Sequence, residues 1–390
     1  MLDIRNKLSR ILLTLLLLLP MTAAGEGVPV WSLLTCEPGT EVYQLFGHTA
    51  LRMRDAETGR DLVFNYGMFS FDTPNFRWRF TRGETDYSLG VTPLEFFEYE
   101  YAMRGSDVTE QVLNLLPEES LKLGDLLFEN YRPENRVYRY NYFYDNCTTR
   151  ARDMIEKAVG GPVVYPAAVD GERSLRDILH EFARGWNRLG IDMLIGREAD
   201  MPASGRDQMF APLYFMHDLS TAMVVRDGVS SPLVSSEDKL VVAPVELDDS
   251  DFPFTPAMAS AFLLLLCLSV LHMAFHHGWP LWPWDMFLLL LQGLAGLIIA
   301  FLVFFSVHPA VDSNVLVWFF NPLPLLALPF VVYNDIRRRH FWYHYVNVAW
   351  AAAFLILCLF TAQFIPHMVY ALASCLLLTS VTHIYIYRKK

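Results

Sequence analysis

The stretch FYDNCTTRARDM occupies residues 143–154 and marks a change from a tyrosine-rich run to a helical pattern. Asp145 and Asn146 both belong to the residue types that cap helix N-termini, so the sequence predicts a helix that begins within a residue of Cys147. A helix N-terminus favours an anion, and the thiolate is the nucleophilic form of cysteine. This position favours a reactive role for Cys147, with a structural cysteine as the alternative.

A candidate base for this thiol lies earlier in the chain. Residues 46–71, FGHTALRMRDAETGRDLVFNYGMFSF, read as two strands joined by a turn that contains a glycine. His48 stands at the start of the first strand and Asn65 lies in the second. A catalytic thiol needs a base and a polar group that orients the base, and these two residues can supply them. The competing interpretation is a packing histidine beside Gly47 and an asparagine that shapes a bulge beside Gly67.

The rest of the segment up to about residue 250 mixes strands and helices. The pattern predicts strands at 107–115 and 239–247 and helices at 92–103, 117–131, 174–186 and 208–219. The predicted fold class is therefore α+β. His180 and His217 fall in helical stretches with polar neighbours, and we expect both at the surface.

The two ends of the chain are apolar in different ways. Residues 1–24 combine a basic start, a short apolar run and small residues, which is the pattern of a secretory signal peptide. Beyond residue 257 come five runs long enough to cross about 30 Å of hydrocarbon. They lie at about 257–275, 286–306, 315–333, 346–364 and 368–387.

Basic residues orient these five predicted transmembrane helices. Arg337, Arg338 and Arg339 follow the third run, and the chain ends Arg388, Lys389, Lys390, whereas the loops at 307–314 and 365–367 contain no Lys or Arg. The positive-inside rule places both basic clusters in the cytoplasm. We therefore expect an exported domain at 25–250, a linker at 251–256 and a transmembrane domain at 257–390.

Charge and cysteine content limit the possible partners. The formal net charge of the chain is −11, which argues against a nucleic-acid partner. Three of the five cysteines, Cys267, Cys358 and Cys375, lie in the apolar runs and are read as small apolar residues. Cys36 and Cys147 lie in the exported part, where a disulfide between them is the alternative to a reactive thiol. We expect no cofactor and no metal ion.

Four segments together resemble a known family. They are LLTCEPGTEVYQLFGHTALRMRD (33–55), VFNYG (63–67), RGETDYSLG (82–90) and YRYNYFYDNCTTRARDMIE (138–156). In this order they resemble the periplasmic domain of the Lnb-type lipoprotein N-acyltransferases. That domain is a circularly permuted papain-like fold of the NlpC superfamily, similar to lecithin retinol acyltransferase. The resemblance implies that fold here, followed by a bundle of five transmembrane helices.

The resemblance also implies roles for individual residues. Cys147 would be the nucleophile and His48 the base. Permuted acyltransferases often use a second histidine close to the first, and none stands near His48, so Asn65 is the best candidate for the orienting group, followed by Asp145 and Tyr43. Asn146 and Arg150, which flank the cysteine, complete the set of supporting residues.

The implied reaction is a two-step acyl transfer. Cys147 would take an acyl chain from a membrane phospholipid as a thioester and pass it to the α-amine of a diacylated apolipoprotein. The implied location is the bacterial inner membrane, with the catalytic domain in the periplasm. The loop in SVHPAVDSNVLVWFFNPLPLL (306–326) is similar to a loop of the family, so we expect His308 and Asn314 near the active site. A polar turn before a proline-kinked helix is the alternative.

Two other functions remain open at this point. Many NlpC relatives are cell-wall cysteine peptidases, although five membrane helices and the permuted order do not favour one. A non-enzymatic membrane sensor that binds lipid or lipoprotein would not need the thiol of Cys147 at all.

Overall fold

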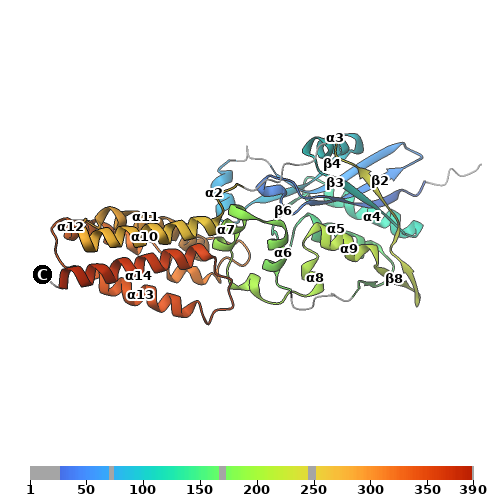
Figure 1. The fold of residues 1–390 in the computed structure, drawn as a ribbon. Helices are drawn as coiled ribbons and strands as arrows, with labels where there is room; N and C mark the ends of the chain where they lie inside the picture. Colours follow the sequence, from blue (N-terminus) through green and yellow to red (C-terminus); the bar gives the residue numbers. More distant parts are fainter. Residues whose placement is uncertain (1–26, 70–73, 167–172, 245–251, 389–390) are drawn as a thin grey trace, which may run out of the picture.

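The computed structural model describes residues 27–69, 74–166, 173–244 and 252–388. The predicted signal peptide at 1–24 lies outside these residues. Figure 1 shows two parts, an N-terminal domain built on a β-sheet and a C-terminal bundle of long helices. The predicted α+β domain followed by apolar helices is therefore confirmed.

The N-terminal domain is organised around a seven-stranded antiparallel sheet with the order β10-β5-β1-β2-β3-β4-β6. Its strands are β1 (Val30–Cys36), β2 (His48–Asp55), β3 (Arg60–Met68), β4 (Asp86–Pro93), β5 (Val108–Leu113), β6 (Val137–Arg139) and β10 (Val234–Val241). A smaller sheet contains β7 (Val163–Val164), β8 (Met223–Arg226) and β9 (Val229–Pro232).

Helices cover both faces of the large sheet because successive strand residues point to opposite sides. Leu33 packs in one apolar core with α4 (Pro117–Tyr131) and α5 (Cys147–Ala158). Its neighbour Leu34 packs in a second core with α3 (Leu94–Arg104). Figure 1 shows α3 on one side of the strands and α4 and α5 on the other. Cys147 thus begins a helix that is held against the sheet.

The hairpin predicted at 46–71 is formed by β2 and β3. Asp55 accepts hydrogen bonds from the backbone N–H groups of Glu57 and Thr58 and from the Thr58 hydroxyl, which closes the turn. Gly59 completes it at φ +68°, a conformation that favours glycine. The hairpin places His48 and Asn65 on adjacent strands.

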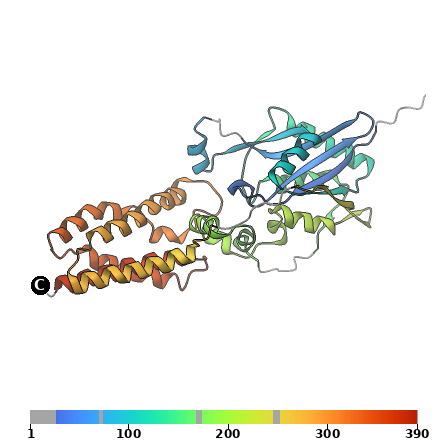
Figure 2. The same ribbon diagram turned by 45° about the horizontal axis from the view of Figure 1, so that its top comes forward.

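The remaining segments of the domain connect the sheet with the bundle. They are η1 (Val42–Gln44), α2 (Phe76–Thr81), α6 (Leu175–Phe182), α7 (Gly185–Leu194), η2 (Arg197–Asp200), α8 (Gly205–Gln208) and α9 (Pro212–Ser220). In both views α2 and α7 lie where the domain meets the bundle (Figures 1 and 2).

The bundle consists of α10 (Pro256–His277), α11 (Trp282–Phe305), α12 (Leu323–Ile336), α13 (Tyr343–Leu357) and α14 (His367–Arg388). Four candidate spans are long and apolar enough to cross a membrane, the third being Val315–Ile336, and α13 is a shorter apolar helix. These helices are apolar outside as well as inside, as expected for a surface in contact with lipid.

The third predicted run, 315–333, is not one continuous helix. It contains the 3-10 segment η3 (Val315–Trp318), and α12 begins only at Leu323, after Pro322. Proline has no N–H and disrupts a helix, so the preceding carbonyl groups need other partners. Gln292 of α11 donates to the Phe319 carbonyl at 2.9 Å. A Cβ on Gly296 would lie 2.4 Å from the Asn321 nitrogen, so only glycine allows this close packing.

Backbone hydrogen bonds form part of the joint between the two parts of the molecule. Gly196 N–H donates to the Ala310 carbonyl at 2.6 Å, and Val307 N–H donates to the Arg82 carbonyl at 2.9 Å. A Cβ on Gly83 would lie 2.7 Å from the His308 nitrogen. The loop after α11 is therefore seated on the N-terminal domain, with glycine at two of the closest approaches.

A second loop of the bundle reaches the same region. The predicted run at 346–364 forms α13 over Tyr343–Leu357, and the residues after it leave the helix. Phe364 N–H donates to Asp200 at 3.1 Å, and the Phe364 ring lies 5.1 Å from that of His180. His180 is also hydrogen-bonded to the buried Asp192 at 2.7 Å. The expectation that His180 is a surface residue is therefore wrong, whereas His217 is exposed as expected.

Candidate active site

Cys147 is the first residue of α5, and its position follows from the cap before it. The Asn146 side chain accepts hydrogen bonds from the N–H groups of Thr148 and Thr149 at 2.9 Å each. Its amide group donates to the carbonyls of Tyr142 and Phe210, which fixes the cap in the protein interior. The prediction that the helix begins at the thiol is confirmed, and Asn146 acts as its cap.

The structure brings Cys147, His48 and Asn65 together. The His48 ring lies beside the Cys147 side chain, and His48 Nε2 is hydrogen-bonded to Asn65 Oδ1. Because Nε2 is occupied by Asn65, Nδ1 is the nitrogen that can face the sulfur. Gly67 lies against the pair, since a Cβ on it would be 3.8 Å from both Cys147 Cβ and His48 Cε1. Cys147, His48 and Asn65 thus lie next to one another.

The electrostatics of this site favour a thiolate next to an imidazolium. Burial alone would raise the pKa of the Cys147 thiol, but the charge and hydrogen bond of His48 and the Thr49 N–H hold it below its ordinary value. Burial alone would lower the pKa of His48, but the Cys147 charge and the hydrogen bonds to Cys147 and Asn65 raise it. Each charged form stabilises the other in a buried site.

Two further contacts fix the position of His48 relative to α5. The Thr49 and Thr148 hydroxyls are hydrogen-bonded at 3.0 Å and are fully buried. The second contact comes from α3, which covers the sheet face opposite α5. Its Tyr101 ring is stacked with the His48 ring, with 6.4 Å between centroids and 14° between planes. Neither contact was anticipated from the sequence, because each depends on how a helix packs on the sheet.

Cys36 is close to the pair but does not form a disulfide with Cys147. Both are free cysteines, and Cys36 lies directly opposite His48 in the β1–β2 ladder. Burial raises the pKa of the Cys36 thiol well above its ordinary value, against a hydrogen bond with Tyr101 that lowers it. The pKa shifts of the two thiols are therefore opposite in direction, which favours the neutral form of Cys36.

Three other candidate residues, Asp145, Arg150 and Tyr43, make their contacts away from His48. Asp145 pairs with Arg150 through two hydrogen bonds at 2.5 and 2.8 Å, and the Arg150 guanidinium lies 3.5 Å from the centre of the Tyr138 ring. Tyr43 is exposed and packs edge-on against Phe69. None of the three has an interaction with His48 that would orient it, so Asn65 occupies that position alone among the residues considered.

His308 and Asn314, the two candidate residues in the loop after α11, have different surroundings. His308 Nε2–H donates to the Phe80 carbonyl at 2.6 Å, and the His308 ring lies 6.2 Å from that of Tyr142. Asn314 is buried at the joint, where it donates to the Met193 carbonyl at 2.9 Å and accepts from Gln363 at 2.9 Å. Asn314 thus holds the two parts together, whereas His308 ends a row of aromatic rings.

That row of rings, which we call the aromatic row, runs from the thiol to the bundle. Its members in order are Tyr140, Tyr87, Phe69, Phe76, Phe80 and His308, with centroid separations of 4.3, 5.0, 5.9, 5.9 and 5.5 Å. Tyr140 lies against Gly67, beside Cys147. At the other end, the exposed Trp78 of α2 lies 5.3 Å from Phe301 of α11. Aromatic side chains therefore connect the surroundings of Cys147 with the transmembrane helices.

Two family models match the chain. The Lnb N-terminal periplasmic domain matches residues 28–170, and the Lnb transmembrane domain matches residues 248–390. The chain belongs to the Lnb family. Searches among curated proteins and among solved structures gave no match.

Membership in the Lnb family supports a membrane enzyme that modifies lipoproteins, with a periplasmic domain. The matched periplasmic segment contains His48, Asn65 and Cys147, together with all of the aromatic row except His308. The unmatched segment, 171–247, contains α6 to α9 and the edge strand β10. The candidate site residues thus lie in the part of the chain that the Lnb family shares.

Proposed function

We propose that this protein is a lipoprotein N-acyltransferase of the bacterial inner membrane. It moves an acyl chain from a phospholipid, through a Cys147 thioester, to the α-amine of a diacylated apolipoprotein. The observation that carries the proposal is the Cys147–His48–Asn65 group in the Lnb periplasmic domain, connected by the aromatic row to the membrane helices.

In the first step the Cys147 thiolate attacks the ester carbonyl of the phospholipid. The Asn146 side chain accepts from the N–H groups of Thr148 and Thr149, and the N–H of Cys147 itself is left to donate to the oxyanion. As the tetrahedral intermediate collapses, the C–O bond breaks and His48 gives its proton to the departing lysophospholipid. Asn65 keeps the imidazole oriented throughout.

In the second step the α-amine of the lipoprotein attacks the thioester carbonyl. His48 takes a proton from the nitrogen, the C–S bond breaks, and the thiolate is restored beside the imidazolium. A thioester retains an acyl group that an amine can accept without further activation. Water at this stage would produce a free fatty acid, so the buried position of Cys147 supports transfer over hydrolysis.

The aromatic row supports a lipid donor in particular. Withdrawing an acyl chain into water costs about 0.8 kcal/mol for each CH₂. An apolar path avoids this cost because the chain stays in contact with aromatic rings between the bilayer and the thiol. The short helix α2 presents exposed Trp78 and Phe80 beside Arg77, a composition typical of the membrane–water interface.

The proposed orientation in the membrane follows from the same joint. The loop after α11 is seated on the periplasmic domain, so Arg337 to Arg339 after α12 and the C-terminal end of α14 lie at the cytoplasmic side. A reporter enzyme fused after residue 390 should be active if it is a type that works in the cytoplasm and inactive if it is a type that works in the periplasm. Periplasmic activity of that fusion would contradict the orientation.

The direct test is to trap the acyl-enzyme. The full-length protein in nanodiscs would be incubated with phospholipid labelled in one acyl chain, and intact-protein mass spectrometry would detect the adduct. We expect one hydroxylamine-sensitive acyl group on Cys147 and none on Cys147→Ala. Addition of a diacylated lipopeptide should then move the label to the peptide as an amide.

The two alternative functions give different results in this experiment. A cell-wall peptidase would form no acyl adduct with phospholipid but would cleave peptidoglycan stem peptides with the same thiol. A membrane sensor would bind lipid and function equally well as Cys147→Ser. Either result would replace the proposal.

A further inference from the structure

Three buried titratable side chains gather at the end of the bundle far from the periplasmic domain. Asp285 is near the start of α11, His344 is the second residue of α13, and His383 lies near the end of α14. They are 5%, 4% and 2% exposed, so almost no solvent reaches them. One donor atom from each lies within 4.8 Å of the other two. The proposed acyl transfer uses none of them.

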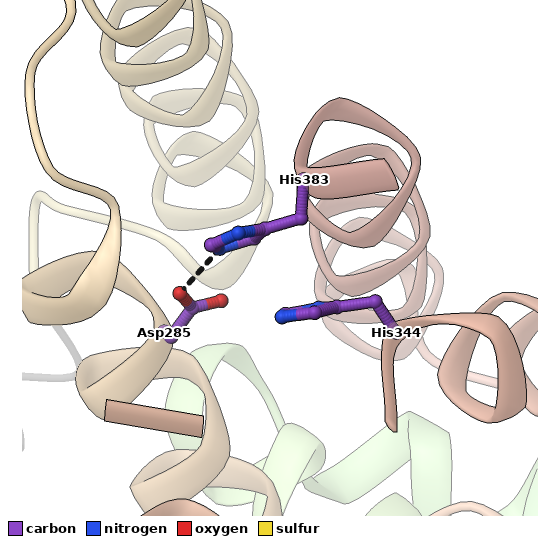
Figure 3. A group of neighbouring side chains, drawn as sticks. All are labelled: Asp285, His344 and His383. Carbon is purple, nitrogen blue, oxygen red and sulfur yellow. Dashed lines mark hydrogen bonds and ion pairs between the residues drawn. The ribbon is translucent and has the colours of Figure 1, made fainter. Parts of the chain in front are cut away.

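The two imidazole rings are held in similar ways. His383 Nε2 is 2.7 Å from Asp285 Oδ2, while its Nδ1 lies 3.7 Å from the Asp335 carboxylate. His344 Nδ1 is hydrogen-bonded to Ser380 Oγ at 3.3 Å. Figure 3 shows the outer edges of both rings directed toward Asp285. Histidines that bind metals usually have the second ring nitrogen fixed by a carboxylate or another acceptor, and both rings here have that arrangement.

The charges in this region lack a strong basic partner. Asp285 and Asp335 are two buried carboxylates, and in the described part of the chain no Lys or Arg forms an ion pair with either. Trp282 N–H and the Tyr387 hydroxyl donate to Asp335. Buried carboxylates are paired with cations or coordinate metals, because desolvation of an unpaired charge is costly. A divalent cation beside Asp285 would balance both carboxylates.

The geometry also limits the kind of ion. Two imidazole nitrogens and one carboxylate oxygen are typical zinc ligands, and bonds of about 2.0–2.2 Å in a tetrahedron hold donors a little over 3 Å apart. The rings of His344 and His383 are stacked, 3.9 Å between centroids and 16° between planes, so the two rings must rotate apart for their nitrogens to meet at one ion beside Asp285. Magnesium and calcium prefer oxygen ligands and fit this set poorly.

We propose that Asp285, His344 and His383 form a binding site for one divalent transition-metal ion of the zinc class. The ion would cross-link α11, α13 and α14 at the end opposite the acyl-transfer site. The cross-link matters most for α13, which has 15 residues and is therefore only about 22 Å long. The sequence did not predict this metal site, because its three residues come from separate helices that only the folded bundle brings together.

The first test measures metal content. The full-length protein would be purified in detergent, supplied with Zn²⁺, passed through a desalting column and analysed for bound metal. We expect about one equivalent in the wild type and a loss to a small fraction of that in Asp285→Asn and His383→Gln, which each remove one of three ligands. Asp335→Asn should retain the ligands but lower the affinity about 10- to 100-fold.

The matched control removes other histidines from the same helical region. His272 and His276 are exposed on α10, and their rings lie 4.4 Å apart, so they can bind zinc weakly without a built site. The double variant His272→Gln, His276→Gln should keep the full equivalent of metal. If this variant loses the metal and Asp285→Asn keeps it, the proposal is wrong.

A second measurement remains informative if a variant folds poorly. Thermal unfolding of the wild type should shift upward when Zn²⁺ replaces a chelator, because the ion binds the folded state. The Asp285→Asn variant should unfold at the same temperature in Zn²⁺ and in the chelator. A wild type that binds no metal and shows no shift would instead make the cluster a self-contained hydrogen-bonded ion pair.

Discussion

The hydroxyl of Thr49 is hydrogen-bonded to the hydroxyl of Thr148 at 3.0 Å. Each threonine directly follows one member of the proposed pair, Thr49 after His48 on β2 and Thr148 after Cys147 on α5. The bond therefore joins the strand that carries the proposed base to the helix that carries the proposed nucleophile, and it helps to set their separation.

Replacing either threonine by valine should loosen this connection. Each single variant leaves a buried hydroxyl without a partner, which costs about 1–3 kcal/mol of folding free energy, and the double variant should cost less than the sum. The rate of Cys147 alkylation by iodoacetamide should fall about tenfold in all three, since about 1.4 kcal/mol less stabilisation corresponds to that factor. Thr35→Val is the matched control, because within the described residues the buried Thr35 hydroxyl has no hydrogen-bond partner. Equal alkylation rates in all variants would show that the bond between Thr49 and Thr148 does not position Cys147 relative to His48.

The rate of acyl transfer should depend on pH through both members of the pair. The thiolate forms as pH rises through the pKa of Cys147, which is lowered, so activity should begin below the range of an ordinary thiol. The imidazolium is lost as pH rises through the pKa of His48, which is raised, so the alkaline limit should lie above the range of an ordinary histidine. Asn65→Ala removes a hydrogen bond that raises the pKa of His48, so its alkaline limit should move to lower pH. A profile unchanged by Asn65→Ala would contradict the orienting role.

The two cysteines of the periplasmic domain should differ sharply in reactivity. Cys36 is buried and its pKa is raised, whereas that of Cys147 is lowered. Limited treatment of the native protein with iodoacetamide should therefore modify Cys147 and leave Cys36 unmodified, as peptide mass spectrometry would show. Cys36→Ala should keep the acyl-transfer activity within a few-fold, since the lost thiol contacts Tyr101 and not the substrate. A comparable loss in Cys36→Ala and Cys147→Ala would assign Cys36 a direct role.

The aromatic row should matter for long acyl chains and not for small reagents. Phe76→Ala interrupts the row between Phe69 and Phe80, so acylation of Cys147 by a long-chain phospholipid should fall about tenfold or more, as expected for the loss of about 1.5–3 kcal/mol of apolar contact. Alkylation by iodoacetamide should not change. Phe128→Ala, on α4 against Phe64, is a control that removes an aromatic ring outside the row. If Phe128→Ala and Phe76→Ala have equal effects, the row is not the route of the acyl chain.

The buried ion pair of Arg176 and Asp192 should be essential for the joint between the two parts. Arg176 also bonds to Asp200 and to the Ile195 and Gly196 carbonyls, which positions the segment that meets the loop after α11. Arg176→Met removes the guanidinium that the buried carboxylates of Asp192 and Asp200 share and should cost about 3–5 kcal/mol. Thermal unfolding of the full-length protein would measure this. Arg132→Met, which breaks an exposed pair with Glu129, should have almost no effect.

Local patterns predicted those parts of the fold that local interactions determine. Asn146 caps the helix of Cys147 through its own neighbours, and Gly59 completes a turn between two adjacent strands, so both features could be predicted from short stretches. His180 was placed wrongly because its partners Asp192 and Phe364 come from the next helix and from the far half of the chain. The break before α12 could have been suspected from Pro322, but the partner of the freed carbonyl, Gln292, could not. The cluster of Asp285, His344 and His383 could not be predicted for the same reason, since only the packing of the bundle brings its members together.

The loops that seat the periplasmic domain are synthesised long after the domain itself. Ala310, which bonds to Gly196, follows two of the five bundle helices, and Phe364, which bonds to Asp200, follows four of them. A ribosome therefore completes Cys147 and its sheet while the contacts that fix them at the bilayer do not yet exist. The order of synthesis therefore sets an order of assembly: the sheet that carries Cys147 and His48 is complete first, and its attachment to the bundle follows only once the loops with Ala310 and Phe364 have been made.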